Sequence, residues 1–275
     1  MRLYVSNLVA GLDTGLDDTD LLLHAVSPFH GQAGIEFFLH THSQRYMSLM
    51  ENVPSWLKDL PAAAHGPFIG IEATSPQGTQ EQAKLLEAYS YAFTMARRLK
   101  SRHLVVHTHQ RVIRLEEKEQ AQRDCRNNLA LLAKMGDREG VALAIENLGI
   151  QHQGVSLFDQ EDFLKLLVSF PKAGCLIDTG HLLVAGWDME RVLSALSGQI
   201  CGYHLHDNGS QQDSHYRMGK GRFDFASFFK LYRRYTPNAD ITLEYGDGQG
   251  ITAEQISSDL YDVLRGISPA GDAGQ

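Results

Sequence analysis

The chain has 275 residues, of which 43% are hydrophobic and 21% charged, a globular composition that excludes a disordered or fibrous protein. Its formal net charge of −8 argues against a broadly basic surface for nucleic acids, although bound divalent cations would neutralise part of that charge. The N-terminus lacks the pattern of a signal peptide and nothing in the chain indicates a membrane protein, so we expect cytoplasmic residence.

Short apolar runs alternate along the chain with longer stretches in which apolar residues have helical spacing. The predicted strands, in chain order, are Leu3–Asn7, Gly34–Leu39, Phe68–Glu72, His103–His107, Ala142–Glu146, Ala173–Asp178, Ile200–His204 and Ile241–Glu244. Strands alternating with helices in this number predict an α/β fold, a single (β/α)8 or TIM barrel. The alternative, a doubly wound sheet, lacks the glycine-rich fingerprint that a dinucleotide-binding fold carries after its first strand.

Two of the predicted helices have clear start signals. Thr79 to Gln82 form a capping-box pattern before the predicted helix 83–99. Asp159 is placed to cap a second predicted helix, which contains Phe163 and Leu167. Pro171 should stop that second helix. No internal linker is visible, so residues 1–267 are predicted to form one catalytic barrel domain, and residues 268–275 a flexible tail.

Four of the later predicted strands close on a polar side chain. In order these side chains are Glu146, Asp178, His204 and Glu244. Catalytic groups of such barrels lie at the carboxyl ends of the strands, so we expect these four to converge at one mouth. Several carboxylates brought together are costly unless a cation neutralises them. The set therefore predicts a divalent metal site.

A second signal is the segment 203–215, which holds three imidazoles and two carboxylates within thirteen residues. Imidazole and carboxylate are common ligands of divalent cations, so this density also favours metal binding. Three further residues are candidates for binding substrate. Arg217 either reaches a phosphate or is a solvated loop cation, Glu36 either lines the pocket or is a structural carboxylate, and His206 either holds a ligand in place or points outward.

An ordered series of motifs gives these candidates a common context. The series comprises His65-Gly66-Pro67-Phe68, Val106-His107, Ile145-Glu146-Asn147, Ile177-Asp178-Thr179-Gly180-His181, His204-Leu205-His206-Asp207, Asp213-Ser214-His215 with Gly219-Lys220-Gly221, and Leu243-Glu244. In this order the motifs resemble those of the xylose isomerase-like barrel superfamily, also called AP endonuclease family 2. That superfamily contains sugar isomerases, ketose epimerases and endonuclease IV.

The resemblance to the isomerases and epimerases implies one metal ion held by Glu146, Asp178, His204 and Glu244. Glu146 and Glu244 would also move protons from opposite faces of a carbon next to a carbonyl. His181 would contact the substrate. The implied function is Lewis-acid-assisted isomerisation or epimerisation of a sugar or sugar phosphate.

The resemblance to endonuclease IV implies instead a two- or three-metal centre that hydrolyses a phosphoester, either abasic-site DNA or a smaller metabolite. Its ligands would be His65, His107, Glu146, Asp178, His181, His204, Asp213, His215 and Glu244. Phe68 stands where that enzyme has a tyrosine that contacts DNA, so DNA is a disfavoured partner.

The expected cofactor is thus one to three divalent ions, and the histidine-rich set favours zinc, with manganese, magnesium or cobalt as alternatives. The expected partner is a small carbohydrate or phosphoester substrate, with no membrane, and a homo-oligomer is compatible with the sequence. A barrel that binds a metal-chelated sugar without turning it over remains a third hypothesis.

Overall fold

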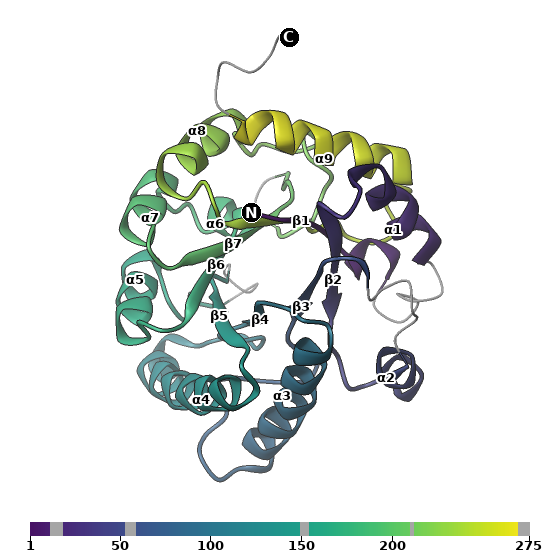
Figure 1. Cartoon of the computed structure of the whole chain (residues 1–275). Coiled ribbons are helices and arrows are strands. Elements are labelled where there is room, and N and C mark those ends of the chain that lie inside the picture. The colour runs from purple at the N-terminus through teal and green to yellow at the C-terminus, as the bar shows by residue number, and fades with distance from the viewer. Residues whose placement is uncertain (12–18, 53–58, 149–153, 210–211, 269–275) are drawn as a thin grey trace.

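The computed structural model describes residues 1–11, 19–52, 59–148, 154–209 and 212–268, and in it eight parallel strands close into a barrel (Figure 1). Neighbours in the barrel are neighbours in the chain, and β8 closes the ring against β1. The strands are β1 (Leu3–Ser6), β2 (Ala33–Phe38), β3 (Ala62–His65), β4 (His103–Val106), β5 (Ala142–Glu146), β6 (Gly174–Asp178), β7 (Ile200–Leu205) and β8 (Asp240–Leu243). The predicted α/β TIM barrel is confirmed.

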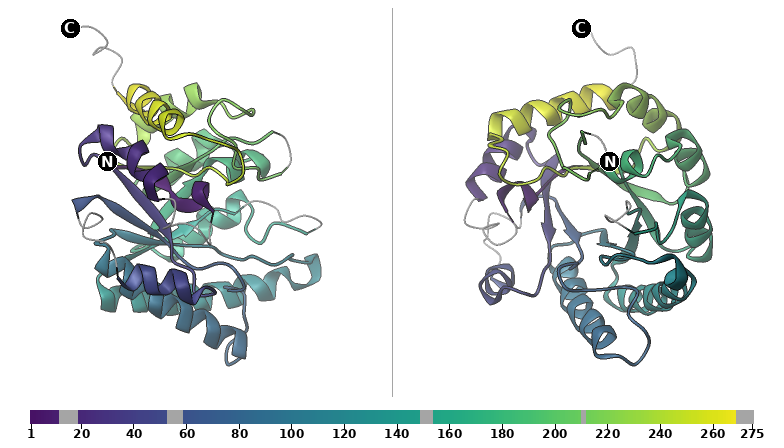
Figure 2. Two further views of the ribbon diagram at one scale, coloured as in Figure 1. Left: turned by 90° about the vertical axis from the view of Figure 1, so that its right-hand side faces the viewer. Right: turned by 180° about the vertical axis from the view of Figure 1, so that it is seen from behind.

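Helices surround the barrel on its outside, as the views in Figure 2 show. The α-helices are α1 (Thr19–Val26), α2 (Gln44–Glu51), α3 (Gln80–Arg98), α4 (Lys118–Glu139), α5 (Gln160–Ser169), α6 (Thr179–Val184), α7 (Met189–Ala195), α8 (Phe225–Tyr235) and α9 (Ala253–Ile267). Short 3₁₀ turns are η1 (Asn7–Ala10), η2 (Ser27–Phe29) and η4 (Leu115–Glu117). Of the helices that the structure describes, none is long and apolar enough to cross a membrane. The predicted tail, residues 269–275, lies outside the described residues.

Both predicted helix starts are confirmed. The Thr79 hydroxyl accepts a hydrogen bond from Gln82 N at 3.2 Å and so caps α3, while Gln82 Oε1 accepts from Gly78 N at 2.7 Å. Asp159 caps α5 by accepting from Asp162 N at 2.9 Å. That helix ends at Ser169, two residues before Pro171. Local capping chemistry therefore fixes where these two helices begin.

The prediction of a third strand at Phe68–Glu72 was wrong. The strand is β3, Ala62–His65, and the predicted run lies in the loop behind it, with a turn at Gly70, whose φ is +67°. Three successive alanines give little strand signal, because alanine is depleted in strands. His65 consequently ends a strand rather than opening one, which places it at the barrel mouth with the other strand-end residues.

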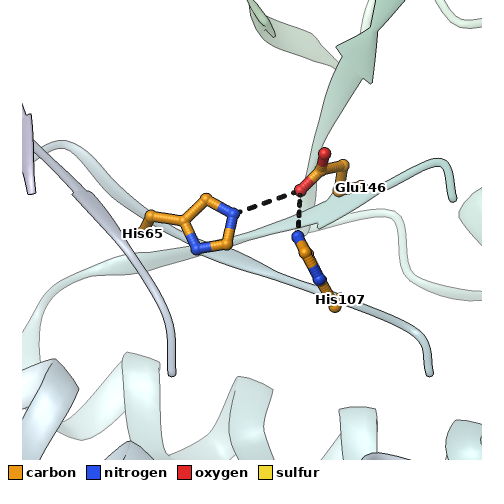
Figure 3. A group of neighbouring side chains, drawn as sticks. All are labelled: His65, His107 and Glu146. Atoms are coloured by element: carbon orange, nitrogen blue, oxygen red, sulfur yellow. Dashed lines mark ion pairs between the residues drawn. The ribbon is translucent and has the colours of Figure 1, made fainter. Parts of the chain in front are cut away.

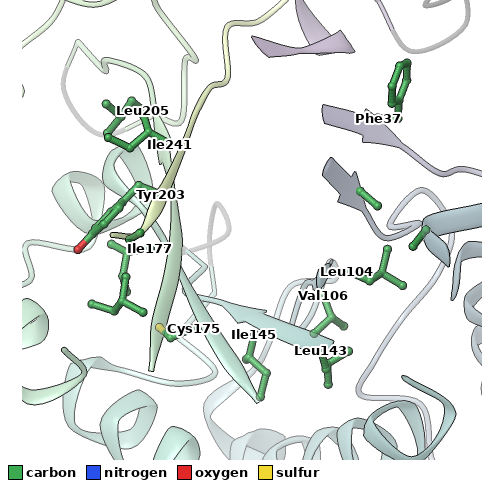
Figure 4. Close-up of a cluster of buried hydrophobic side chains, with 14 of the residues drawn as sticks. Phe37, Leu104, Val106, Leu143, Ile145, Cys175, Ile177, Tyr203, Leu205 and Ile241 are labelled. Carbon is green, nitrogen blue, oxygen red and sulfur yellow. The ribbon is translucent and has the colours of Figure 1, made fainter. Parts of the chain in front are cut away.

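Side chains alternate between the two faces of each strand and so build two separate apolar regions. The larger region lies between strands and helices and includes Leu104, Leu143 and Tyr203 (Figure 4). The smaller one is inside the barrel and contains Val105, Ala144 and Leu176, with Cys201 packed against it. Because alternation has a period of two, Glu146 lies on the same face as Ala144, and Asp178 on the same face as Leu176.

Candidate metal centre

Four buried side chains converge at the carboxyl ends of the strands, and we call them the core group: Glu146, Asp178, His204 and Glu244. Glu146 and Asp178 end β5 and β6, His204 lies in β7, and Glu244 directly follows β8. The three carboxylates surround one ring nitrogen, His204 Nδ1. Its distances are 3.5 Å to Glu146 Oε1, 3.8 Å to Asp178 Oδ2 and 3.3 Å to Glu244 Oε2.

A second cluster, the first outer group, consists of His65, His107 and Glu146 (Figure 3). Glu146 Oε2 lies 3.4 Å from His65 Nε2 and 2.9 Å from His107 Nε2. The other oxygen of the same carboxylate faces the core group. Glu146 is therefore shared by two candidate ion sites, one on each of its oxygens.

A third cluster, the second outer group, consists of His181, Asp213 and His215. His181 comes from the start of α6, and the other two come from the loop behind β7. Asp213 Oδ2 lies 3.0 Å from His181 Nε2 and 2.9 Å from His215 Nε2. His215 adopts a φ of +45°, a left-handed conformation that a non-glycine residue rarely takes. Its Nδ1 is held against Glu244 O at 3.1 Å.

Orphaned polar atoms indicate that these residues fit metal ions. His65 Nε2, His204 Nδ1 and Glu146 Oε2 are buried and have no hydrogen-bond partner of normal geometry among the described residues. A buried polar atom without such a partner is costly, and coordination to a cation would remove that cost. Each group also brings three ligand atoms within 4.8 Å of one another. All nine predicted ligands thus fall into three mutually adjacent groups.

The pKa shifts of the buried carboxylates also favour binding of a cation. Burial raises the pKa of Glu146, but His107 and His204 outweigh it and hold that pKa well below the ordinary value. Burial likewise opposes ionisation of Asp178, yet His181 and His206 lower its pKa to about 2. Both groups are therefore carboxylates at neutral pH, the form that binds a cation.

The pKa values of two imidazoles, those of His204 and His215, shift in the opposite direction. Burial lowers the pKa of His204, but Glu244 and Glu36 raise it well above the ordinary value. His215 is partly buried, with its side chain 22% exposed; burial lowers its pKa, but its hydrogen bond to Asp213 and the charge of Glu244 raise it to about 9. Protons on these rings balance the negative charge, so a divalent cation must displace them to bind.

His206 and Asn147 hold Asp178 in place from two sides. The His206 ring nitrogen Nε2 lies 3.1 and 3.0 Å from the two Asp178 oxygens. Asn147 donates to Asp178 O at 3.1 Å and accepts from Asp178 N at 2.7 Å. The His206 ring thus contacts a candidate ligand, the first of the two alternatives that the sequence left open. Sequence reasoning missed Asn147, although it directly follows Glu146.

Asp207 orders the loop that carries Asp213 and His215. Its Oδ1 accepts from Asn208 N and Phe223 N, both at 2.9 Å, and its Oδ2 accepts from Gly221 N at 2.8 Å. The glycines of this loop, Gly219 and Gly221, belong to the motif series, and the structure gives Gly221 a role. A Cβ on Gly221 would lie 2.3 Å from Asp207 Oδ1, so only glycine lets the backbone approach this carboxylate.

The other two candidates for binding substrate, Arg217 and Glu36, both contact side chains of this protein at short distance. The Arg217 guanidinium makes a two-pronged ion pair with Asp259 of α9, at 2.7 and 2.8 Å. Phosphate binding by Arg217 stays a prediction, and it would require this pair to open or to be shared. Glu36 lies against the core group, where its Oε1 is 2.8 Å from His204 Nε2.

Comparison with solved structures gives matches over nearly the whole chain. A D-tagatose 3-epimerase-like protein has a TM-score of 0.76 at 18% identity, covering 97% of this chain and 98% of its own. The IOLI protein with a bound zinc atom has a TM-score of 0.74 at 16% identity, with coverages of 98% and 98%. The 3-keto-D-glucoside 4-epimerase YcjR from E. coli has a TM-score of 0.73 at 16% identity, with coverages of 96% and 99%. At these identities the likeness shows a shared fold.

Comparison of the sequence, in contrast to the structure, gives a match to one family model. None of the curated proteins compared with this chain matches it. The family model of the xylose isomerase-like TIM barrel does match, over residues 29–267, which is most of the chain and contains every member of the three groups. The chain therefore belongs to the xylose isomerase-like TIM barrel family.

Proposed function

We propose that this protein is a divalent-metal-dependent enzyme that isomerises or epimerises a small sugar or sugar phosphate by proton transfer at the barrel mouth. The observation that carries the proposal is the core group, in which three carboxylates lie within 3.8 Å of one histidine nitrogen. Its ligand types suit one Lewis-acidic ion. Membership of the family and the epimerases among the similar structures agree with this chemistry.

A divalent ion at the core group would polarise a substrate carbonyl and stabilise charge on its oxygen. Glu146 is ionised at neutral pH and therefore accepts a proton from the carbon next to that carbonyl. Glu244, across the His204 ring nitrogen, would pass a solvent proton to the opposite face of that carbon, and the proton taken by Glu146 would leave to solvent. His181 would orient a substrate hydroxyl through Nε2, which would have to give up its contact with Asp213 at 3.0 Å, because Nδ1 is held by Asn147 O at 2.9 Å.

The ligand types also suggest which metal each site prefers. Both outer groups contain two histidines and one carboxylate, a combination that favours zinc. The core group contains one histidine and three carboxylates, so it would also accept manganese, magnesium or cobalt. We propose zinc as the leading cofactor, and we retain cytoplasmic residence as a prediction.

A second function is favoured by the two outer groups. Three adjacent ion sites suit hydrolysis of a phosphoester, because one ion can activate water while the others hold the phosphate. The substrate would be a small phosphoester or, less favourably, abasic DNA, given the net charge of −8. This alternative requires ions in the outer groups, whereas proton transfer requires only the core.

Metal analysis of protein purified without chelator separates the two functions. One tightly bound ion favours isomerisation or epimerisation, and two or three ions favour hydrolysis. The matched variants are Glu244→Gln in the core group and His215→Ala in the second outer group. An isomerase should lose turnover with Glu244→Gln and keep it with His215→Ala, whereas a phosphoesterase should lose turnover with both. Normal isomerase turnover in Glu244→Gln would reject the first proposal.

A further inference from the structure

Glu36 is a buried carboxylate with both oxygens engaged inside the barrel. It lies in β2 and is 1% exposed. Its Oε1 lies 2.8 Å from His204 Nε2, and its Oε2 accepts from the Thr242 hydroxyl at 2.9 Å. An exposed fraction this small, with both oxygens occupied, leaves no surface of Glu36 for a substrate.

The His204 ring separates Glu36 from the core group. Its Nε2 faces Glu36, while its Nδ1 faces the carboxylates of Glu146 and Glu244 at 3.5 and 3.3 Å. Nδ1 has no hydrogen-bond partner within the described part of the chain. If Nε2 carries the proton that it donates to Glu36, the lone pair of the neutral ring is on Nδ1, directed at the candidate ion.

We infer that Glu36 is a positioning residue, which fixes the orientation and tautomer of His204 so that Nδ1 is presented to the metal ion of the core group. The inference rests on the proposed function and deepens it. A histidine that binds a metal usually donates its other ring N–H to a carboxylate or carbonyl, and losing that partner typically weakens metal binding roughly 10- to 100-fold.

Thr242 completes the arrangement. It lies in β8 opposite His204 of β7 in the strand register, and its side chain is buried. Its hydroxyl fixes the second Glu36 oxygen, so the carboxylate cannot rotate away from His204 without breaking a buried hydrogen bond. Three strands, β2, β7 and β8, thus hold one imidazole in one orientation.

The test uses full-length protein, zinc and a competing chelator, with Glu36→Ala and Glu36→Gln as variants. Glu36→Ala should weaken zinc binding at the core group roughly 10- to 100-fold, and the absorption spectrum of the cobalt-loaded protein should change because the ligand geometry changes. Glu36→Gln keeps an oxygen that can accept from Nε2, so it should lose less. It also serves if the alanine variant folds poorly.

Asp240→Asn is the matched control. Asp240 is a buried carboxylate in the same strand as Thr242, but at the opposite end of the barrel, where it accepts from Arg2 N at 2.7 Å. Its substitution should lower stability and leave zinc affinity unchanged. A second measurement needs no metal: the His204 Nε2 proton, followed by NMR of ¹⁵N-histidine-labelled protein, should lose the downfield shift of a hydrogen bond to a carboxylate in Glu36→Ala and keep it in Asp240→Asn.

The outcomes are distinct. Wild-type zinc affinity and an unchanged cobalt spectrum in Glu36→Ala overturn the inference, as does an equal loss of affinity in Asp240→Asn. If wild-type protein binds no divalent ion, the proposed function fails. The ring-proton measurement then still decides about Glu36, because an unchanged Nε2 proton shift in Glu36→Ala contradicts the positioning role.

Discussion

Replacing Asp207 by asparagine should loosen one metal group and leave the core group intact. In the native loop, Asp207 Oδ1 accepts two backbone hydrogen bonds and Oδ2 accepts one, from Gly221 N at 2.8 Å. The amide of asparagine has only one acceptor oxygen. Keeping that oxygen at the Oδ1 position preserves two bonds and turns an N–H group towards Gly221 N, which then loses its partner.

The magnitude follows from that single lost acceptor. A buried donor left without a partner costs about 1–3 kcal/mol, so we expect the free energy of unfolding to fall by about 2 kcal/mol. The affected loop carries Asp213 and His215, so the same loss should weaken binding at the second outer group. If the whole 2 kcal/mol is felt there, the affinity falls roughly 30-fold.

The assay pairs chemical denaturation with a zinc titration against a competing chelator. The control is Asp224→Ala, which removes the α8 cap that accepts from Ser227 N at 3.0 Å and should lower stability without changing zinc binding. Wild-type affinity for every ion in Asp207→Asn would refute the argument. Loss of the core ion before an outer one would refute it equally.

Three further changes have defined outcomes. In chelator, His215 has a pKa of about 9, so the extra stability that it confers is present below its ordinary pKa and is lost as pH rises through 9. Across that pH window the wild-type free energy of unfolding should fall by about 3 kcal/mol relative to that of His215→Asn, measured by denaturation at each pH. Gly180→Ala would place a Cβ 2.0 Å from the His206 ring, so denaturation should show a loss of about 1–3 kcal/mol, and unchanged stability would contradict this packing. Thr79→Ala removes the α3 cap and should cost about 1 kcal/mol, whereas Thr79→Ser should match wild type.

The barrel and the convergence of the strand-end candidate ligands were predictable from sequence because both depend on local patterns. An apolar run that closes abruptly on Glu146 or Asp178 signals a strand end, and alternation then determines which face the side chain takes. The third strand was not predictable in this way. Ala62–His65 has small side chains with little strand preference, and the more apolar run behind it is a loop that packs Phe68 against the His107 ring at 5.2 Å.

The supporting residues were harder to find than the ligands themselves. Thr242 and Glu36 meet because β8 and β2 both flank β1 in the closed barrel. The two residues are 206 positions apart, so no local sequence pattern predicts their contact. The sequence predicted Glu36 as a candidate in the second strand, but it did not predict its contacts with His204 and Thr242. Arg217 shows the same limit, because its partner Asp259 belongs to a helix 42 residues further along the chain.

Glu146 has an evolutionary consequence that follows from its two oxygens. Because one carboxylate lies in both the core group and the first outer group, mutation of Glu146 would remove a candidate ligand from both at once. Mutation of His107 would affect only the outer group, whereas His65 also lies within ligand distance of His204 and Glu244. Related barrels could therefore lose the outer site by a substitution at His107 and keep the candidate central site, and so differ in metal number while sharing the Glu146 carboxylate.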